Sequence, residues 1–213
     1  MQSTWLRLIS IHLPAADMNN RLLFPAVILV VLLLVVVVLL FWPVADKQVA
    51  ESKKPPVNFV LQTAQGPLEL AQLRGKIVLL YFGYTNCPDV CPTSLALLGF
   101  ALHKLEPGEQ EKIQPVFISV DPNRDKVENL AEYVAYFHPS MLGATGTEDQ
   151  IASVARTFGV IYSYEQDDSD EDYVVNHSSM TYLLDRDGRL YETIPHGASP
   201  DKIVATIRRA LVH

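Results

Sequence analysis

The only two cysteines of the chain lie in one short stretch that joins two regular elements of different kinds. The run from Lys76 to Phe82 (KIVLLYF) is short, apolar and rich in β-branched and aromatic residues, which is typical of a buried strand. From Thr93 to Leu105, leucines recur every three or four residues, which indicates one face of a helix. Cys87 and Cys91 therefore lie at a strand-to-helix junction, and the fold must combine both kinds of element around them.

This position matters for the chemistry of the two sulfurs. A helix N-terminus carries about half a positive charge and several unpaired N–H groups, so a thiol there ionises more easily. Pro92 suits the first helical position, which makes Cys91 the expected N-cap and puts Cys87 in the preceding loop. At helical spacing, Cα atoms four residues apart are about 6 Å from each other, close enough for a disulfide. The pair can therefore be a disulfide, a dithiol or two ligands of a metal site.

An apolar segment near the N-terminus predicts a membrane anchor. Leu22 to Trp42 contains no charged residue, and its 21 residues would span about 30 Å as a helix, the thickness of the hydrocarbon core. We expect an uncleaved transmembrane helix rather than a signal peptide, whose apolar core is shorter. The predicted parts are an N-terminal tail (1–21), the anchor (22–42), a linker (43–56) and one folded domain (57–213).

Charge and cysteine content limit the compartment and the partners. The net charge of -7 argues against nucleic-acid binding. Basic residues lie on both sides of the apolar segment and do not decide its orientation. A pair of cysteines that can form a disulfide belongs in an oxidising compartment, so we expect the folded domain on the outer side of the membrane.

Strands and helices alternate after the linker. Strands are expected near 57–61, 76–82, 115–120 and 160–164, with a hairpin at 180–184 and 190–194. Helices are expected near 92–105, 121–137, 148–158 and 200–211, with Asp121 and Ser199 as N-caps and Gly159 after the third helix. Residues 68–73 fit a short strand or a helical turn, and the acidic stretch 165–172 fits a solvated loop or a partner surface. This order predicts an α/β sandwich with a mixed sheet.

Four motifs in order give the domain a resemblance to the SCO/SenC family. Gly83–Pro92 (GYTNCPDVCP) resembles the family pattern GYTxCPxxCP, and Ser119–Asp125 (SVDPNRD) resembles SxDPxRD. Gly143–Thr147 (GATGT) matches a G-x-TG-T turn. Asp172–Ser178 (DYVVNHS) resembles DYxVxH-S/T, although many members have Asp where this chain has Asn176.

The resemblance implies a thioredoxin-like fold on a membrane anchor and copper binding by Cys87, Cys91 and His177. It also implies a role in building the dinuclear copper A centre of cytochrome c oxidase. Its copper A-bearing subunit is then the expected partner, with another copper chaperone as a further one. The chain shows no convincing transit peptide, so we expect the outer face of a bacterial cytoplasmic membrane rather than the mitochondrial inner membrane. The choice of His177 rests on the resemblance, because spacing does not distinguish it from the other histidines.

The donor set agrees with copper. Two thiolates and one imidazole are soft ligands that suit Cu(I) and can also hold Cu(II). Metal binding and disulfide formation use the same sulfurs, so each excludes the other. The alternative function is a thiol–disulfide reductase that uses Cys87 and Cys91 as its redox-active pair, and a weaker one is a peroxide-reducing thiol enzyme. Three residues separate the cysteines and no proline lies beside His177, unlike a dedicated thioredoxin-type reductase, which favours copper. Met180 is expected in the core.

Overall fold

The computed structural model describes residues 20–41, 55–166 and 173–213. The chain divides into two units on either side of the bond between Ser52 and Lys53. The described part of the first unit is the helix α1 (Asn20–Phe41). Within the described residues, no helix combines the length and the apolar character that crossing a membrane requires. The anchor expected at 22–42 is therefore not shown and stays a prediction, and Trp42 lies outside the described residues.

A five-stranded mixed sheet forms the centre of the second unit, in the order β5-β4-β3-β8-β9. Its strands are β3 (Ile77–Gly83), β4 (Ile113–Ser119), β5 (Leu142–Ala144), β8 (Thr181–Leu184) and β9 (Leu190–Ile194). β3, β4 and β5 run parallel, whereas β8 is antiparallel to both β3 and β9. Every residue of β3 is buried, which explains its continuous apolar sequence at the middle of the sheet. The expected α/β fold with a mixed sheet is confirmed.

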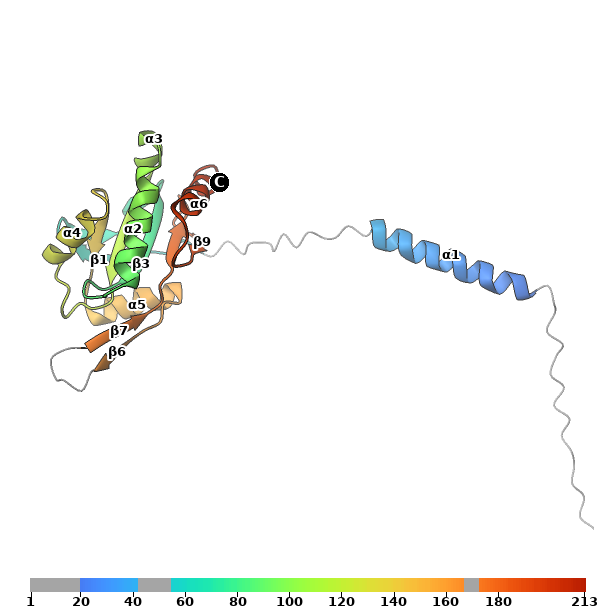
Figure 1. Ribbon diagram of the computed structural model, residues 1–213, viewed down its shortest axis with the longest axis horizontal. Helices are drawn as coiled ribbons and strands as arrows, with labels where there is room; N and C mark the ends of the chain where they lie inside the picture. The colour runs from blue at the N-terminus through green and yellow to red at the C-terminus, as the bar shows by residue number, and fades with distance from the viewer. Residues whose placement is uncertain (1–19, 42–54, 167–172) are drawn as a thin grey trace, which may run out of the picture. The chain divides into compact units, whose positions relative to one another are not determined.

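Helices flank this sheet (Figure 1). α2 (Val90–His103) packs against α6 (Pro200–Leu211), which also contacts β3 and β9. α4 (Val127–Ala135) contacts β5 and a small hairpin at the start of the domain. The remaining elements are β1 (Val60–Thr63), β2 (Gly66–Glu69), the 3₁₀ helix η1 (Leu70–Leu73), α3 (Pro107–Gln110) and α5 (Glu148–Phe158).

A second hairpin forms a separate sheet of its own. β6 (Tyr162–Gln166) pairs antiparallel with β7 (Tyr173–His177), and Tyr162 lies opposite His177. Neither strand joins the five-stranded sheet, and Figure 1 shows the hairpin beside α5. Most of the acidic stretch predicted at 165–172 lies outside the described residues.

Two predicted helix starts are wrong. α2 begins at Val90 with Asp89 as its N-cap, so Cys91 and Pro92 occupy the second and third helical positions. This is tolerated because the first four N–H groups of a helix have no partner within it, and the first helical bond runs from the N–H of Thr93 to Asp89. α4 begins at Val127 rather than after Asp121.

The later helices agree with the sequence prediction. α5 spans Glu148–Phe158 and ends at Gly159, which has a left-handed conformation with φ 68°. α6 spans Pro200–Leu211, and the Ser199 side chain accepts a bond from the N–H of Lys202. The sequence allowed a short strand or a helical turn at 68–73. The structure has both, because β2 leads directly into η1.

Candidate metal centre

Three soft ligand atoms converge where β3, α2 and β7 meet. The sulfurs of Cys87 and Cys91 and a ring nitrogen of His177 all lie within 4.8 Å of one another. The Cys91 sulfur is 3.1 Å from Nε2 of His177, across 86 residues of sequence. Both cysteines are free and buried, and His177 is partly buried. The structure therefore brings together the three residues that the resemblance assigned to a metal.

Each ligand is positioned by a different element. Cys87 lies in the loop after β3, and its N–H donates to the Tyr84 carbonyl at 3.3 Å. Cys91 lies in the first turn of α2 and is fully buried. His177 is the last residue of β7. Two aromatic rings pack edge-on around its imidazole, those of Tyr81 and Tyr84, with ring centroids 6.3 and 5.9 Å away.

Hydrogen bonding fixes which ring nitrogen of His177 faces the sulfurs. Nδ1 lies 3.1 Å from the carbonyl oxygen of Ser178, an acceptor only, so Nδ1 must carry the proton and donate. Nε2 then presents a lone pair toward Cys91. This tautomer is the one that a metal ligand needs, because the second ring nitrogen orients the first.

Burial disfavours the charged forms of Cys91 and His177 when no metal balances the charge. It raises the pKa of the Cys91 thiol, and the neighbouring sulfur of Cys87 raises it further. Burial also lowers the pKa of His177. At Cys91 the cost of burying an anion therefore outweighs the helix N-terminus, which the sequence led us to expect would favour the thiolate. A cation at the centre would reverse this balance, because metal binding displaces the thiol protons.

An open hollow gives access to the centre from outside. It measures about 220 Å³, and Cys87 and His177 both line it. Its other walls come from the loop before α2 and from β7 (Tyr84, Pro88, Asp89, Val90, Val174, Val175 and Asn176). Cys91 lies behind this lining, so an incoming partner meets Cys87 first.

The spacing of the three donor atoms suits a single soft ion bound between them. Three atoms bonded to one ion at about 2.0–2.3 Å are separated from each other by about 3.5–4 Å in a planar arrangement. The observed separations, from 3.1 Å between Cys91 and His177 to at most 4.8 Å, bracket this range and need only small shifts. In the described residues, no other His, Cys, Asp or Glu joins this group to make a closed tetrahedral site. Such an incomplete shell suits an ion that is to be passed on.

Comparison with known proteins identifies the family. The family model described as SCO1/SenC matches residues 47–212. The chain belongs to the SCO1/SenC family. The mitochondrial SCO2 homolog of Mus musculus is 46% identical over 140 residues, which cover 65% of this chain and 55% of the mouse protein. This SCO1/SenC chain thus spans about half the length of the curated relatives that it matches.

Solved structures of the SCO1/SenC family share the fold. The solution structure of apo Sco1 from Thermus thermophilus is 44% identical, with a TM-score of 0.63 over 74% of this chain and 89% of that one. The crystal structure of Arabidopsis thaliana ScoI with copper bound is 35% identical, with a TM-score of 0.67 over 74% of this chain and 98% of that one.

The other described histidines of this SCO1/SenC chain do not join the group of three ligands. His196 bonds to Ser94 at 2.7 Å, and the rings of His103 and His138 are 4.6 Å apart. Met180 is partly buried and packs against the core, as expected. Sequence reasoning favoured a helix cap for Asp121, with support of the metal ligands or partner docking as the alternative; the structure buries it completely and pairs it with Arg124 at 2.5 Å. The SVDPNRD motif was the only signal that these residues belong near the centre.

Proposed function

We propose that this chain is a copper carrier that binds the ion through Cys87, Cys91 and His177. The convergence of two sulfurs and one imidazole nitrogen is the observation that carries the proposal. This donor set favours copper over hard cations, and its incomplete shell suits delivery rather than permanent storage. The copper-bound relative from Arabidopsis supports the choice of metal.

We further propose that the copper is delivered to the copper A-bearing subunit of cytochrome c oxidase. The family membership supports this partner, and the hollow beside Cys87 leaves an edge of the centre open to it. In this proposal the uncharged segment 22–42 anchors the chain in a bacterial cytoplasmic membrane, with the domain on the outer face.

A thiol–disulfide reductase is the second candidate function. It is favoured by one observation, the free thiol of Cys87 at the lining of the hollow, where a partner's disulfide could reach it. Oxidation to a Cys87–Cys91 disulfide would remove two electrons and both thiol protons, and it would also remove two copper ligands. The two functions therefore compete for the same sulfurs.

Copper titration of the reduced full chain in detergent tests the first proposal. We expect one copper per chain, with a thiolate-to-Cu(II) charge-transfer band in the absorption spectrum. His177→Ala should weaken copper binding by about 100-fold or more, since even residues that only orient ligands contribute 10–100-fold. The same variant should still form the disulfide, because both sulfurs remain.

His213→Ala provides the matched control, since that histidine packs on Tyr191 at the C-terminus, away from the centre. It should bind copper like the parent chain. If His177→Ala holds Cu(I) and Cu(II) as tightly as the parent chain does, the ligand assignment is wrong. If the reduced chain binds no copper yet turns over protein disulfides, the reductase is the correct function.

A further inference from the structure

The strand that carries His177 is not held in place by the main sheet. β7 pairs with β6 alone, in a two-stranded sheet. Isolated hairpins of two strands are only marginally stable in water, so other contacts must fix the position of this one. Those contacts determine whether His177 reaches the sulfurs.

Alternation along β7 places three side chains on one face. Tyr173, Val175 and His177 are two residues apart, so they point to the same side of the strand. Val175 is 2% exposed, whereas Val174 between them is 51% exposed and faces away. A shift of one residue in the position of β7 would turn His177 outward. Whatever fixes Tyr173 therefore also fixes the side on which His177 lies.

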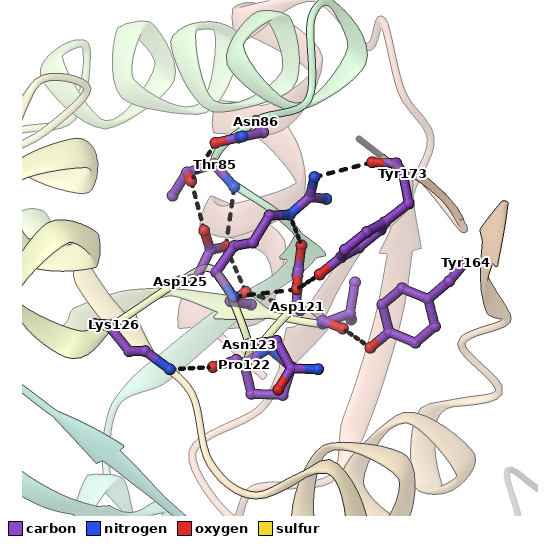
Figure 2. Close-up of polar contacts among 12 residues, drawn as sticks. Thr85, Asn86, Asp121, Pro122, Asn123, Asp125, Lys126, Tyr164 and Tyr173 are labelled. Carbon is purple, nitrogen blue, oxygen red and sulfur yellow. Dashed lines mark hydrogen bonds and ion pairs between the residues drawn. The ribbon is translucent and has the colours of Figure 1, made fainter. Parts of the chain in front are cut away.

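Two side chains, those of Asp121 and Arg124, hold Tyr173; Figure 2 labels Asp121 and Tyr173. The Tyr173 hydroxyl donates to Oδ1 of the fully buried Asp121 at 2.6 Å. Nε of Arg124 donates to the other oxygen of Asp121 at 2.5 Å, and Nη1 of Arg124 donates to the Tyr173 carbonyl at 2.9 Å. The guanidinium also lies 3.7 Å from the centre of the Tyr173 ring. We call Asp121, Arg124 and Tyr173 the Asp121 cluster.

The same loop also holds the segment that carries the cysteines. Thr85, two residues before Cys87, donates from its hydroxyl to Oδ1 of Asp125 at 2.5 Å and from its N–H to Oδ2 at 3.0 Å. The N–H of Asp125 in turn donates to the Asp121 carbonyl at 2.9 Å. Figure 2 shows Thr85 and Tyr173 reaching the loop from opposite sides. One loop therefore contacts both ligand-bearing segments.

We propose that the Asp121 cluster is a positioning device that sets His177 against the two sulfurs. The proposal deepens the copper-carrier function and rests on it. Asp121, Arg124 and Tyr173 touch no ligand atom. They act by fixing β7 at Tyr173, which is four residues, or about 13 Å of extended chain, from His177. Their loss should weaken copper binding, which needs His177. It should leave the disulfide equilibrium of Cys87 and Cys91 unchanged, because that equilibrium needs only the cysteines.

Tyr173→Phe tests this with little disturbance, because it keeps the ring under Arg124 and leaves Asp121 paired. In the reduced full chain we expect copper to bind about 10–100-fold more weakly, the range seen when a group that orients a metal ligand is lost. The equilibrium constant for forming the Cys87–Cys91 disulfide against glutathione should change less than twofold. Tyr136→Phe, at an 87% exposed position, is the control and should change neither quantity.

A double variant separates positioning from general loss of stability. Once His177→Ala has removed the ligand, adding Tyr173→Phe should weaken copper binding no further. The proposal is overturned if Tyr173→Phe leaves copper affinity unchanged, if it shifts the disulfide equilibrium equally, or if the two substitutions are additive.

A measurement without copper keeps this inference separate from the proposed function. In the metal-free reduced chain, Tyr173→Phe should speed amide hydrogen exchange at Val174 and Asn176, whose N–H groups face β6, at least fivefold while exchange in β3 stays unchanged. If His177→Ala does not weaken copper binding, the copper proposal fails, and this exchange result alone decides whether the cluster positions β7. Unchanged exchange in β7 would overturn the positioning role.

Discussion

Gly83 lies at the end of β3, where the Cys91 side chain takes up the space beside the backbone. A Cβ atom at this position would be 2.6 Å from the Cys91 sulfur and 2.9 Å from the Phe117 ring. Contacts this short cannot be accommodated without moving buried groups. The glycine of the GYT motif is therefore required by the packing of the sulfur, and not by an unusual backbone angle.

Gly83→Ala should lower the free energy of unfolding by about 1–3 kcal/mol, the usual cost of overpacking a core. It should also displace Cys91 and weaken copper binding. Urea denaturation and copper titration measure the two effects. Gly108→Ala is the matched control, because a Cβ there meets nothing within 4 Å. A Gly83→Ala chain as stable as the control would contradict this account of the packing.

At the scale of single residues, the sequence predicted that the two cysteines lie at a strand-to-helix junction. It did not predict which residues surround them. The junction between strand and helix followed from local periodicity. His177 followed only from a motif, because its partner sulfur is 86 residues away. Asp121 looked like a helix cap because Asp-Pro commonly begins a helix. It pairs with Arg124 close by, but also with Tyr173, which is 52 residues distant, and no local pattern indicates the contact with Tyr173.

Among the elements, α5 shows why some helices were predicted correctly. Thr147 accepts a bond from the N–H of Gln150 at 3.2 Å, and the Gln150 side chain accepts one from the N–H of Thr147 at 2.8 Å. This reciprocal arrangement fixes the first turn by local chemistry alone. α2 and α4 lack side-chain caps of this kind, so local chemistry marks their starts less clearly.

Thr147→Ala should lower the free energy of unfolding by about 1 kcal/mol, because a helix N–H loses its partner. Thr147→Ser keeps a hydroxyl in the same place and should recover most of that loss. Urea denaturation of both variants checks the prediction. Equal stability of the Ala and Ser variants would show that the cap contributes nothing here.

At the scale of the whole molecule, a buried and a partly buried histidine link stability to pH. Burial lowers the pKa of both His138 and His177 below the ordinary value of 6.5. The unfolded chain therefore binds protons at these positions more readily than the folded chain. Stability should fall as the pH drops from 6.5 toward the lowered values.

Thermal unfolding of the metal-free chain between pH 7.5 and pH 5 measures this effect. Most carboxylates remain ionised in that range, so the histidines dominate the change. His138→Gln should reduce the slope of stability against pH, whereas His213→Gln, at the exposed C-terminus, should not. A slope that is unchanged in His138→Gln would remove His138 from the explanation.

The separation of the β6–β7 hairpin from the five-stranded sheet has a consequence for how an ion would leave. Amide groups at the centre of a sheet exchange only when the whole domain unfolds, whereas a two-stranded unit can detach at a lower free energy. Detachment of the hairpin would move Nε2 of His177 away. The sulfurs of Cys87 and Cys91 would stay on the rest of the domain. The ion would then be bound by two atoms and open to capture by a competing ligand, without any melting of the sheet.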